Sequence, residues 1–376
     1  MSRTDRGPFR VAMVLTGTAG GIGGHVAAVV PRLAELGLTI RIWCPADVAT
    51  GPLAAVGVPV APLSRLSGIR SADIVHSHGY KASALSAPIV RSSRVPMVTT
   101  WHNDIAAAGA ARLVGATLRL ISAAGSTLVL GVSPDLVQAA RRLGASAELL
   151  PVPAAQLAAA TQDRDPVRDR LGVAGSDVLV ITVARLAPQK NLGLLLDIAS
   201  RTGTGPGSPR YLIVGDGPER PMLQQRINAE QLPVRLLGHR DDIPDLLGAA
   251  DLALNTSTWE GSSLAVQETL QAGVGLVITD VGGNRALLGD AVAWIRPDDP
   301  AGAAEKIRRL AADPVARAGL AAAGLRRAAG WPGQQEIAVE LADRYRQVRD
   351  RERSVRTGQC GRPPRFPGSA SRGPDS

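Results

Sequence analysis

The chain has 376 residues, enough for two domains that each bury a core, and only 3% of them are aromatic, so its interior must be built mainly from Ala, Val, Leu and Ile. The net charge of +9 is uneven: residues 1–165 hold 15 Lys and Arg against 9 Asp and Glu, residues 166–350 hold 21 against 22, and residues 351–376 hold 6 against 2. This basic first half suits an anionic substrate or an anionic membrane surface. Scattered arginines and few aromatic residues disfavour nucleic acid.

The two cysteines, Cys44 and Cys360, have no nearby partner in the sequence. This excludes a cysteine-based metal site and favours a reducing compartment. Residues 1–10 are polar, so we expect no signal peptide. The longest apolar candidate, residues 120–132, is interrupted by polar residues and glycine and is too short to cross a bilayer. We therefore expect a cytoplasmic protein, soluble or peripheral at the inner face of the cell membrane.

Strand-like and helix-like patterns alternate along the chain. The expected strands are residues 10–15, 39–44, 73–76, 96–100, 128–132 and 148–151, then 178–183, 210–214, 234–237, 251–254 and 275–279, with helices that include 26–36, 81–91 and 134–143. Repeated β–α–β units predict two doubly wound parallel sheets. We expect one sheet in residues 1–165 and the other in 166–330, with residues 151–166 as the linker.

The end of the chain is expected to contain two further segments. Residues 331–350 hold a helical pattern at 333–349 and are expected to form a closing helix that returns toward the first domain. Residues 351–376 are rich in Gly, Pro, Arg and Ser. Because such a composition cannot bury enough apolar surface to fold, we expect a disordered basic tail.

Polar and glycine-rich clusters stand mostly where the expected strands end. They are residues 17–25, 101–103, 185–191, 215–218 and 255–260. Ligands of parallel sheets bind at the carboxyl ends of the strands. A single cleft between two facing domains would therefore collect all of these clusters.

The glycine-rich segment 17–24 lacks the G-x-G-x-x-G spacing of a dinucleotide site, because Val26 stands where the last glycine belongs. Gly21, Gly23 and Gly24 would still let backbone N–H groups approach a phosphate or a sugar closely. A plain tight turn is the alternative. We expect a ligand-binding loop, since a turn does not need so many glycines.

Four histidines lie in the first half, and His76 and His78 would point to the same face of one strand. No further His or Cys is spaced to complete a metal site with them, so we expect no metal. We expect His76 and His78 to be core and strand-end residues. His102 follows a strand on the cleft side, which makes it a candidate substrate ligand or proton handler.

Lys190 is one of only three lysines among 42 basic residues, and it follows Arg185 by five positions. A lysine in a chain that otherwise uses arginine indicates a site that requires a compact ammonium group. Together, Arg185 and Lys190 could neutralise a diphosphate and stabilise it as a leaving group. A surface pair at a helix start is the alternative, although cations there oppose the helix dipole.

Glu260 and Glu268 bracket the segment Gly261-Ser262-Ser263-Leu264, which is typical of a helix start. The two glutamates lie roughly 80° apart around a helix, so helical spacing alone does not pair their carboxylates. The hydroxyls and unpaired N–H groups between them are suited to a phosphate. A capped surface helix with two solvated glutamates is the alternative.

Four features of the chain resemble, in their order and spacing, the retaining glycosyltransferases of family 4. They are Arg185 with Lys190, the segment 214–218, the pair Glu260 and Glu268, and the segment 279–283. The resemblance covers nearly the whole chain except the tail. It implies the GT-B fold, in which two Rossmann-like domains face each other across a cleft. Two positions depart from the family pattern and bear on sugar selectivity: Asn284-Arg285-Ala286 and Thr269-Leu270.

The resemblance also implies residue roles. Arg185 and Lys190 would hold the diphosphate of a nucleotide-sugar, Glu268 the ribose hydroxyls and Glu260 the sugar hydroxyls, with His102 near the anomeric carbon. The remaining expected donor contacts are Gly21, Gly23, Gly24, Gly215, Gly217, Gly261, Ser262, Ser263 and Leu264, and the expected acceptor side contains His25, Trp101 and Asn103.

The implied reaction is transfer of a hexose-type sugar with retention, without a metal or another cofactor, by front-face displacement. The acceptor would be a glycan, a lipid or a small molecule, plausibly in the synthesis of a cell-envelope glycolipid or polysaccharide. Two alternatives remain open from the sequence: a nucleotide-sugar 2-epimerase of the same architecture, and a non-catalytic sugar- or nucleotide-binding protein.

Overall fold

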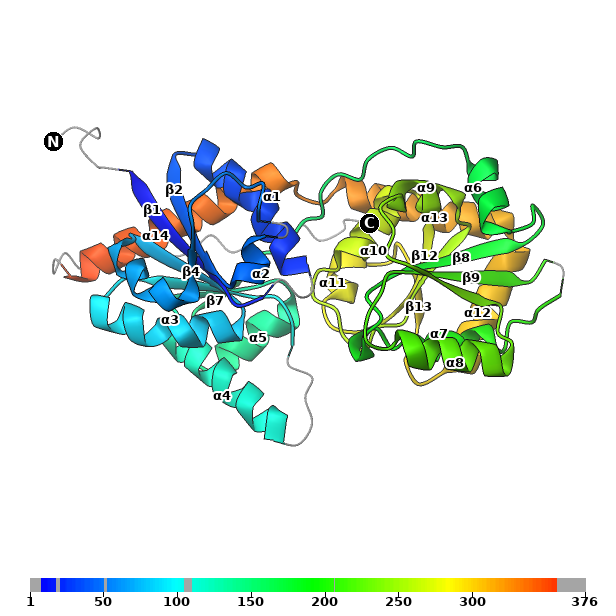
Figure 1. Cartoon of the computed structure of the whole chain (residues 1–376), viewed down its shortest axis with the longest axis horizontal. Coiled ribbons are helices and arrows are strands. Elements are labelled where there is room, and N and C mark those ends of the chain that lie inside the picture. Colours follow the sequence, from blue (N-terminus) through cyan, green and yellow to red (C-terminus); the bar gives the residue numbers. More distant parts are fainter. Residues whose placement is uncertain (1–7, 18–20, 51–52, 105–109, 206, 357–376) are drawn as a thin grey trace, which may run out of the picture.

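The computed structural model describes residues 8–17, 21–50, 53–104, 110–205 and 207–356, which form two α/β domains side by side (Figure 1). The first domain contains a seven-stranded parallel sheet in the order β3-β2-β1-β4-β5-β6-β7, and the second a six-stranded parallel sheet in the order β10-β9-β8-β11-β12-β13. The strands are β1 (Phe9–Leu15), β2 (Leu38–Cys44), β3 (Val60–Pro62), β4 (Ile74–His78), β5 (Met97–Trp101), β6 (Leu128–Gly131), β7 (Ala147–Leu149), β8 (Val178–Val183), β9 (Pro209–Val214), β10 (Val234–Gly238), β11 (Leu252–Asn255), β12 (Gly275–Thr279) and β13 (Ala293–Ile295).

Helices cover both faces of each sheet (Figure 1). The first domain contains α1 (Ile22–Glu35), α2 (Ala46–Ala49), the 3-10 segment η2 (Leu63–Ser71), α3 (Tyr80–Ser93), α4 (Ala110–Gly125) and α5 (Pro134–Arg142). The second contains α6 (Arg164–Leu171), the 3-10 turn η3 (Pro188–Lys190), α7 (Leu192–Ala199), α8 (Arg220–Glu230), α9 (Ile243–Ala249), α10 (Leu264–Gln271), α11 (Asn284–Leu288), α12 (Pro300–Ala312) and α13 (Pro314–Ala329). The last helix is α14 (Gln334–Arg356).

The predicted fold class, two doubly wound parallel sheets, is confirmed, and every expected strand is present within two residues of its predicted bounds. The strands read as continuous apolar runs because helices bury both faces of a parallel sheet. Strands β3 and β13 were not predicted; both lie at sheet edges and span only three residues each. Segments this short carry too little apolar patterning to be recognised.

Helix α14 packs against the first domain, although it follows the second domain in the chain. Ile337, Leu341 and Tyr345 are buried in the same core cluster as β1 and α1. The helix continues to Arg356, so residues 351–356 are helical and not part of a disordered tail as predicted. Contacts with the first domain explain this extension, because Arg349 stacks over Phe9 and Arg353 pairs with Asp73 at 3.3 Å. The rest of the predicted tail lies outside the described residues.

Among the described residues, no helix combines the length and the apolar character that crossing a bilayer requires.

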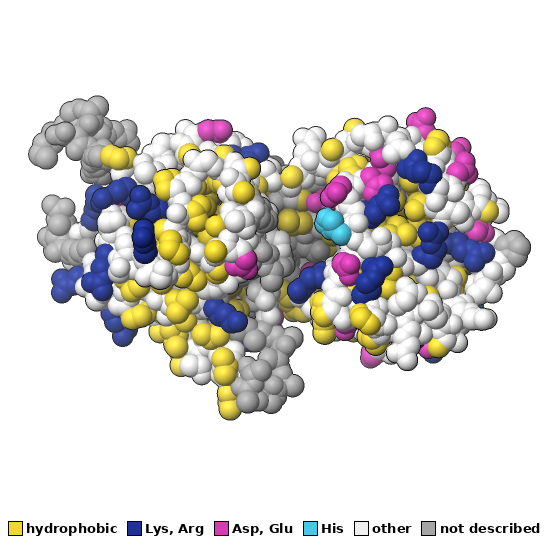
Figure 2. Space-filling model, in the orientation of Figure 1, with side chains coloured by type: hydrophobic (Ala, Val, Ile, Leu, Met, Phe, Trp, Pro, Cys, Tyr) yellow, Lys and Arg dark blue, Asp and Glu magenta, His cyan; other side chains and the backbone are white. Residues whose placement is uncertain are grey.

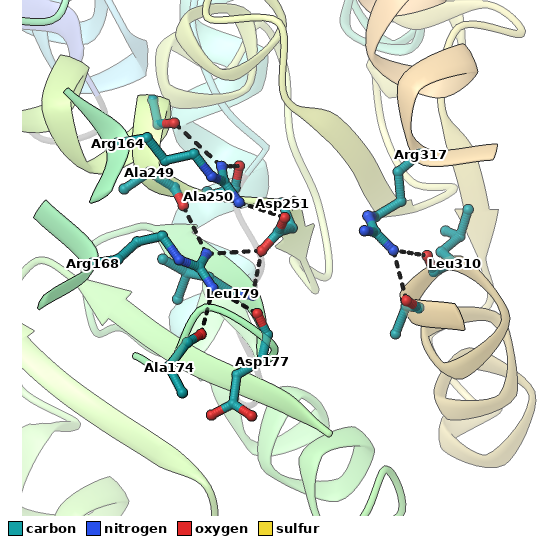
Figure 3. A network of polar contacts seen from close by, with 12 residues as sticks. Arg164, Arg168, Ala174, Asp177, Leu179, Ala249, Ala250, Asp251, Leu310 and Arg317 are labelled. Atoms are coloured by element: carbon teal, nitrogen blue, oxygen red, sulfur yellow. Dashed lines mark hydrogen bonds and ion pairs between the residues drawn. The ribbon is translucent and has the colours of Figure 1, made fainter. Parts of the chain in front are cut away.

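A buried arginine ties α6 to the amino-terminal edge of the second sheet (Figure 3). The side chain of Arg168 is 4% exposed and donates to the carbonyls of Ala174, Asp177 and Ala249. It also pairs with Asp251 at 3.0 Å, and that carboxylate accepts from the backbone N–H of Leu179. Nearby, Arg317 of α13 donates to the carbonyls of Leu310 and Ala311 at the end of α12 (Figure 3).

We expect Arg168→Met to lower the free energy of unfolding by about 3–5 kcal/mol, because three carbonyls lose their buried donor and the Asp251 carboxylate loses the buried one of its two arginine partners. Arg164→Gln is the matched control: Arg164 contacts the same Asp251, but its side chain is 41% exposed. This control should cost about 1 kcal/mol or less. Chemical denaturation of both variants measures the difference, and equal losses would contradict the assigned role of Arg168.

Candidate functional site

A pocket of about 470 Å³ lies between the two domains, within the range of small-molecule sites. Its lining comes from loops and helix starts that follow strands of both sheets, as the rule for parallel sheets requires. The predicted site residues that line it are Gly21, His102, Asn103, Arg185, Lys190, Gly215, Glu260, Gly261, Ser262, Ser263 and Leu264. The predicted site residues outside this lining are Gly23, Gly24, His25, Trp101, Gly217 and Glu268.

Lys190 and Glu260 form an ion pair in this pocket, with 2.6 Å between Nζ and Oε1. Glu260 is only 4% exposed, and the same oxygen accepts from the Ser257 hydroxyl at 2.7 Å. The adjacent strands β8 and β11 bring the two side chains together, since each residue lies in the loop after one of them. A buried carboxylate needs such a partner because its desolvation is costly. The sequence analysis expected Lys190 beside Arg185 and did not foresee this pair.

Backbone segments approach each other unusually closely around Glu260. A Cβ on Gly282 would lie 2.2 Å from the Glu260 carbonyl oxygen, and one on Gly283 would lie 2.3 Å from that of Gly261. The N–H of Gly283 donates to the Glu260 carbonyl at 2.7 Å. Gly261 in turn faces the first domain, where a Cβ would lie 2.7 Å from a methyl group of Val132. These glycines therefore set how closely the loop at 260–261 fits between its neighbours.

Arg185 follows β8, and its exposed side chain makes no ion pair with a described residue. Gly215 supports this loop from the end of β9: its φ is +130°, and a Cβ there would lie 2.0 Å from the Ala184 carbonyl oxygen. Gly217 packs against the same loop, where a Cβ on it would lie 2.3 Å from the Leu186 carbonyl oxygen, and it is not among the lining residues of the pocket. Its predicted contact with a ligand stays a prediction, and the structure shows its packing role.

Two polar lining residues were not predicted from the sequence: His239 and Arg240, directly after β10. Arg240 pairs with Asp242 at 2.5 Å. The signal was present, because the expected strand at 234–237 ends immediately before them and the rule that identified the other loops applies equally here.

Helix α10 begins at the pocket, with Ser263 as its N-cap residue. The first N–H groups of a helix have no partner within the helix and carry a partial positive charge. The hydroxyl of Ser262 is engaged elsewhere, since it donates to the Val152 carbonyl in the segment between the domains at 2.7 Å. Glu268 lies one turn after Leu264 on the same side of α10, and burial raises its pKa.

The first domain presents a second helix start to the same pocket. Gly21, with φ +85°, is the N-cap of α1, and a Cβ on it would lie 3.1 Å from Leu264 at the start of α10. The helix begins at Ile22, so Gly23 and Gly24 belong to its first turn and not to a loop as predicted. Residues 18–20 of the predicted loop lie outside the described residues.

Two of the three residues expected on the acceptor side are buried in the first domain. Trp101 is completely buried and donates to the Ser122 hydroxyl, so it belongs to the core and not to the cleft. His25 is 6% exposed and lies behind His102, with 5.7 Å between ring centroids. Asn103 lines the pocket.

His102 and three imidazole rings behind it form a continuous array in the core of the first domain. Nε2 of His102 lies 3.0 Å from Nδ1 of His78, and the rings of His78 and His76 are 4.1 Å apart. His76 is held by the Thr100 hydroxyl at 2.7 Å and the Tyr345 hydroxyl at 2.6 Å. His76 is therefore a core residue, as predicted, and His78 contacts the ring that reaches the pocket.

Burial lowers the pKa of all four rings below the ordinary value, to about 4 for His25 and well below 6.5 for His76, His78 and His102. The neighbouring imidazoles lower the pKa of these last three further, because like charges repel. The array is therefore neutral at pH 7. Among the described residues, no group of three or more His, Cys, Asp or Glu side chains has a geometry that could hold a metal ion.

We expect the protein to lose stability as the pH falls from 7 to 5.5. The unfolded chain takes up protons on these histidines below about pH 6.5, while the folded protein does not, so each ring costs up to about 1.4 kcal/mol per pH unit. In His25→Gln the loss between pH 7 and 5.5 should be smaller by about 1 kcal/mol, because one such ring is absent. Denaturant unfolding at both pH values measures this, and an unchanged pH dependence in the variant would contradict a neutral buried His25.

The arrangement suits a ligand with an anionic centre and polar ends. Two exposed guanidinium groups, of Arg185 and of Arg240 in its pair with Asp242, one ammonium and the positive ends of α1 and α10 converge on the pocket. Glu260 is the acidic side chain among the described lining residues, and it can accept hydrogen bonds from hydroxyl groups.

Comparisons with known proteins agree with this geometry. The family model described as "Glycosyltransferase Family 4" matches residues 19–152, and the one described as "Glycosyl transferases group 1" matches residues 177–313. The putative teichuronic acid biosynthesis glycosyltransferase TuaC of Bacillus subtilis (strain 168) is 30% identical over 245 residues, which are 63% of this chain and 61% of that protein. The D-inositol 3-phosphate glycosyltransferase of Geodermatophilus obscurus is 28% identical over 84% of this chain and 82% of its own length.

Solved structures show the same fold at low sequence identity. Anabaena Alr3699/HepE in complex with UDP is 20% identical, with a TM-score of 0.78 over 90% of this chain and 99% of that one. WaaG, a glycosyltransferase involved in lipopolysaccharide biosynthesis, is 14% identical, with a TM-score of 0.70 over 89% of this chain and 99% of that one. With both halves of the chain matched by glycosyltransferase models and both sheets in place, the chain belongs to the group 1 and family 4 glycosyltransferases and has the GT-B fold.

Proposed function

We propose that this glycosyltransferase moves a hexose-type sugar from a nucleotide-diphosphate sugar to an acceptor hydroxyl, with retention of the anomeric configuration and without a metal ion or another cofactor. The convergence of Arg185, Lys190 and two helix N-termini on one pocket carries the proposal. The structural neighbour Alr3699/HepE has been solved with UDP and with UDP-glucose, which supports a UDP-sugar as donor. No observation favours the 2-epimerase alternative.

In the proposed complex, the diphosphate occupies the space between Arg185, Lys190 and the start of α10. Lys190 has three N–H donors, so it can keep its hydrogen bond to Glu260 and still contact a phosphate oxygen. Glu260 then accepts hydrogen bonds from the sugar hydroxyls, and the ribose hydroxyls reach Glu268 along the same side of α10. His102 lies across the pocket, where it can contact the transferred sugar.

The reaction breaks the bond between the anomeric carbon and the diphosphate oxygen and forms a bond from that carbon to the acceptor oxygen on the same face. The acceptor proton passes to the departing phosphate oxygen. Negative charge accumulates on the diphosphate, and the fixed positive groups around it stabilise that charge without reorganisation. The two domains close over the pocket and keep water from competing with the acceptor.

The first domain supplies the acceptor side, and we propose a cytoplasmic enzyme, peripheral at the membrane, that acts on a cell-envelope acceptor. The names of two similar proteins support this: TuaC is named a putative teichuronic acid biosynthesis glycosyltransferase, and an Escherichia coli protein that is 28% identical is named a UDP-Gal:alpha-D-GlcNAc-diphosphoundecaprenol alpha-1,3-galactosyltransferase. The similarity to D-inositol 3-phosphate glycosyltransferases supports a small-molecule acceptor as the second candidate.

Lys190→Ala should lower turnover of a UDP-sugar by about 10²–10³, because a positive group at the developing charge of the leaving diphosphate is removed. Lys190→Arg should restore turnover only in part, since the planar guanidinium cannot fill the place of a compact ammonium beside Glu260. Arg326→Ala, at an exposed arginine of the second domain outside the pocket, is the control. Turnover should be measured in EDTA, and near-normal turnover of a folded Lys190→Ala would refute the role in charge stabilisation.

The two glutamates should separate in their effects. Glu268→Gln should mainly raise the Michaelis constant of the donor, because ribose contacts are alike in the ground and transition states. Glu260→Gln should mainly lower kcat, because it loosens both the sugar and the Lys190 ammonium group during the chemical step. Steady-state kinetics with varied donor tests this, and the reverse pattern would show that the two roles are exchanged.

A further inference from the structure

Helices α3 and α4 form an exposed apolar surface on the first domain. Figure 2 shows hydrophobic side chains gathered over these two helices. Hereafter the α3–α4 face means their outward side chains. Its large hydrophobic residues are Leu85 on α3, 48% exposed, and Leu113, Val114, Leu120 and Ile121 on α4, 73%, 60%, 55% and 40% exposed.

The pattern on α4 is that of an amphipathic helix whose apolar side is turned outward. Leu113, Leu120 and their neighbours Val114 and Ile121 recur at intervals of seven residues and therefore lie along one side of the helix. The buried residues of α4 are smaller: Gly115, Ser122 and Ala123 face the domain. A surface helix normally buries its larger apolar side chains, so this inverted arrangement indicates a partner for the face.

The same face is basic and lacks acidic residues. Neither α3 nor α4 contains Asp or Glu, while Lys81, Arg91 and Arg112 are exposed on them. Between Asp73 and Asp135 the chain contains one acidic residue, Asp104, and it pairs with Arg119. This asymmetry favours an anionic partner.

We propose that the α3–α4 face docks on an anionic lipid bilayer, with its leucine, valine and isoleucine side chains in the interface and its cations among the headgroups. Exposed aliphatic side chains combined with a basic rim are the requirements for an interfacial helix. A second copy of the chain fits poorly, because a twofold contact would place two all-cationic rims against each other. Nucleic acid fits poorly as well, because the face offers no aromatic side chain for stacking.

This docking deepens the proposed function and rests on it for its consequence. Helix α4 begins seven residues after Asn103, which lines the pocket. A bilayer bound at the α3–α4 face therefore contacts the same domain that carries Asn103 and, by the proposed function, the acceptor side. A lipid-linked acceptor would then be held at the domain that receives it.

The test uses the full-length protein and vesicles of phosphatidylcholine with or without phosphatidylglycerol, analysed by co-sedimentation. The wild type should bind the anionic vesicles only and should be released at high salt. The double variant Leu113→Ser with Leu120→Ser should bind at least tenfold more weakly. The control Met222→Ser with Val315→Ser alters residues that are 49% and 82% exposed on the second domain and should bind as the wild type does.

A charge variant, Arg91→Gln with Arg112→Gln, should also weaken binding at least tenfold, whereas Arg308→Gln with Arg326→Gln on the second domain should not.

Undiminished binding of the Leu113/Leu120 variant would overturn the assignment of this face. A wild-type dimer that this variant dissociates would overturn it in favour of self-association. A thermal shift with UDP, measured on the same proteins, keeps the two proposals apart: absent vesicle binding with an intact UDP shift refutes the docking and leaves the transferase proposal standing.

Discussion

The site is organised around one buried carboxylate. Glu260 cannot remain charged in its position without compensation, and the chain provides it through Lys190 and Ser257. To do so, the loops after β8 and β11 must meet, which adjacent parallel strands allow only at their carboxyl ends. The carbonyl of the same residue accepts from Gly283 after β12. Three consecutive strands of the second sheet are therefore connected at Glu260, and the positive groups of the pocket are positioned relative to it.

The second constraint is the close approach of backbone segments. Gly215, Gly261, Gly282 and Gly283 stand where any side chain would collide with a neighbouring carbonyl or methyl group. These glycines therefore pack loops against each other, and the packed loops hold Arg185, Glu260 and the start of α10 in place around the pocket. Gly21 has a related role between the domains, since it brings the start of α1 to that of α10. Two helix dipoles then point into one pocket.

Helix α14 links the end of the chain to the pocket through the first domain. Tyr345 contacts His76 at 2.6 Å, and the array of imidazoles leads from there to His102 in the lining. The hydrogen bonds do not run through the whole array, because Tyr345 and Thr100 occupy both nitrogens of His76, and His76 meets His78 only through their rings. His78 in turn contacts His102 at 3.0 Å, so the last helix of the chain supports, by packing, a side chain of the pocket that precedes it by more than 200 residues.

The sequence alone determined the fold and most of the lining. Apolar runs at regular intervals require parallel strands, and parallel strands place the loops after them at one edge of the sheet. Arg185, Lys190, Gly215 and Glu260 could therefore be assigned to a common site before their contacts were known. The same rule would have found His239 and Arg240. It works because it depends on local pattern and chain direction alone.

Only the tertiary structure decided which side chains meet. Four features depend on how loops from separate strands pack: the ion pair of Lys190 with Glu260, the burial of Trp101, the histidine array behind His102 and the helix start at Ile22. Spacing along the chain does not encode the distances between these groups. The outward orientation of the apolar side of α4 was also decided by the tertiary structure. Its periodicity predicts an amphipathic helix, but which side faces the solvent depends on the small residues that fit against the domain and on the neighbouring helix α3.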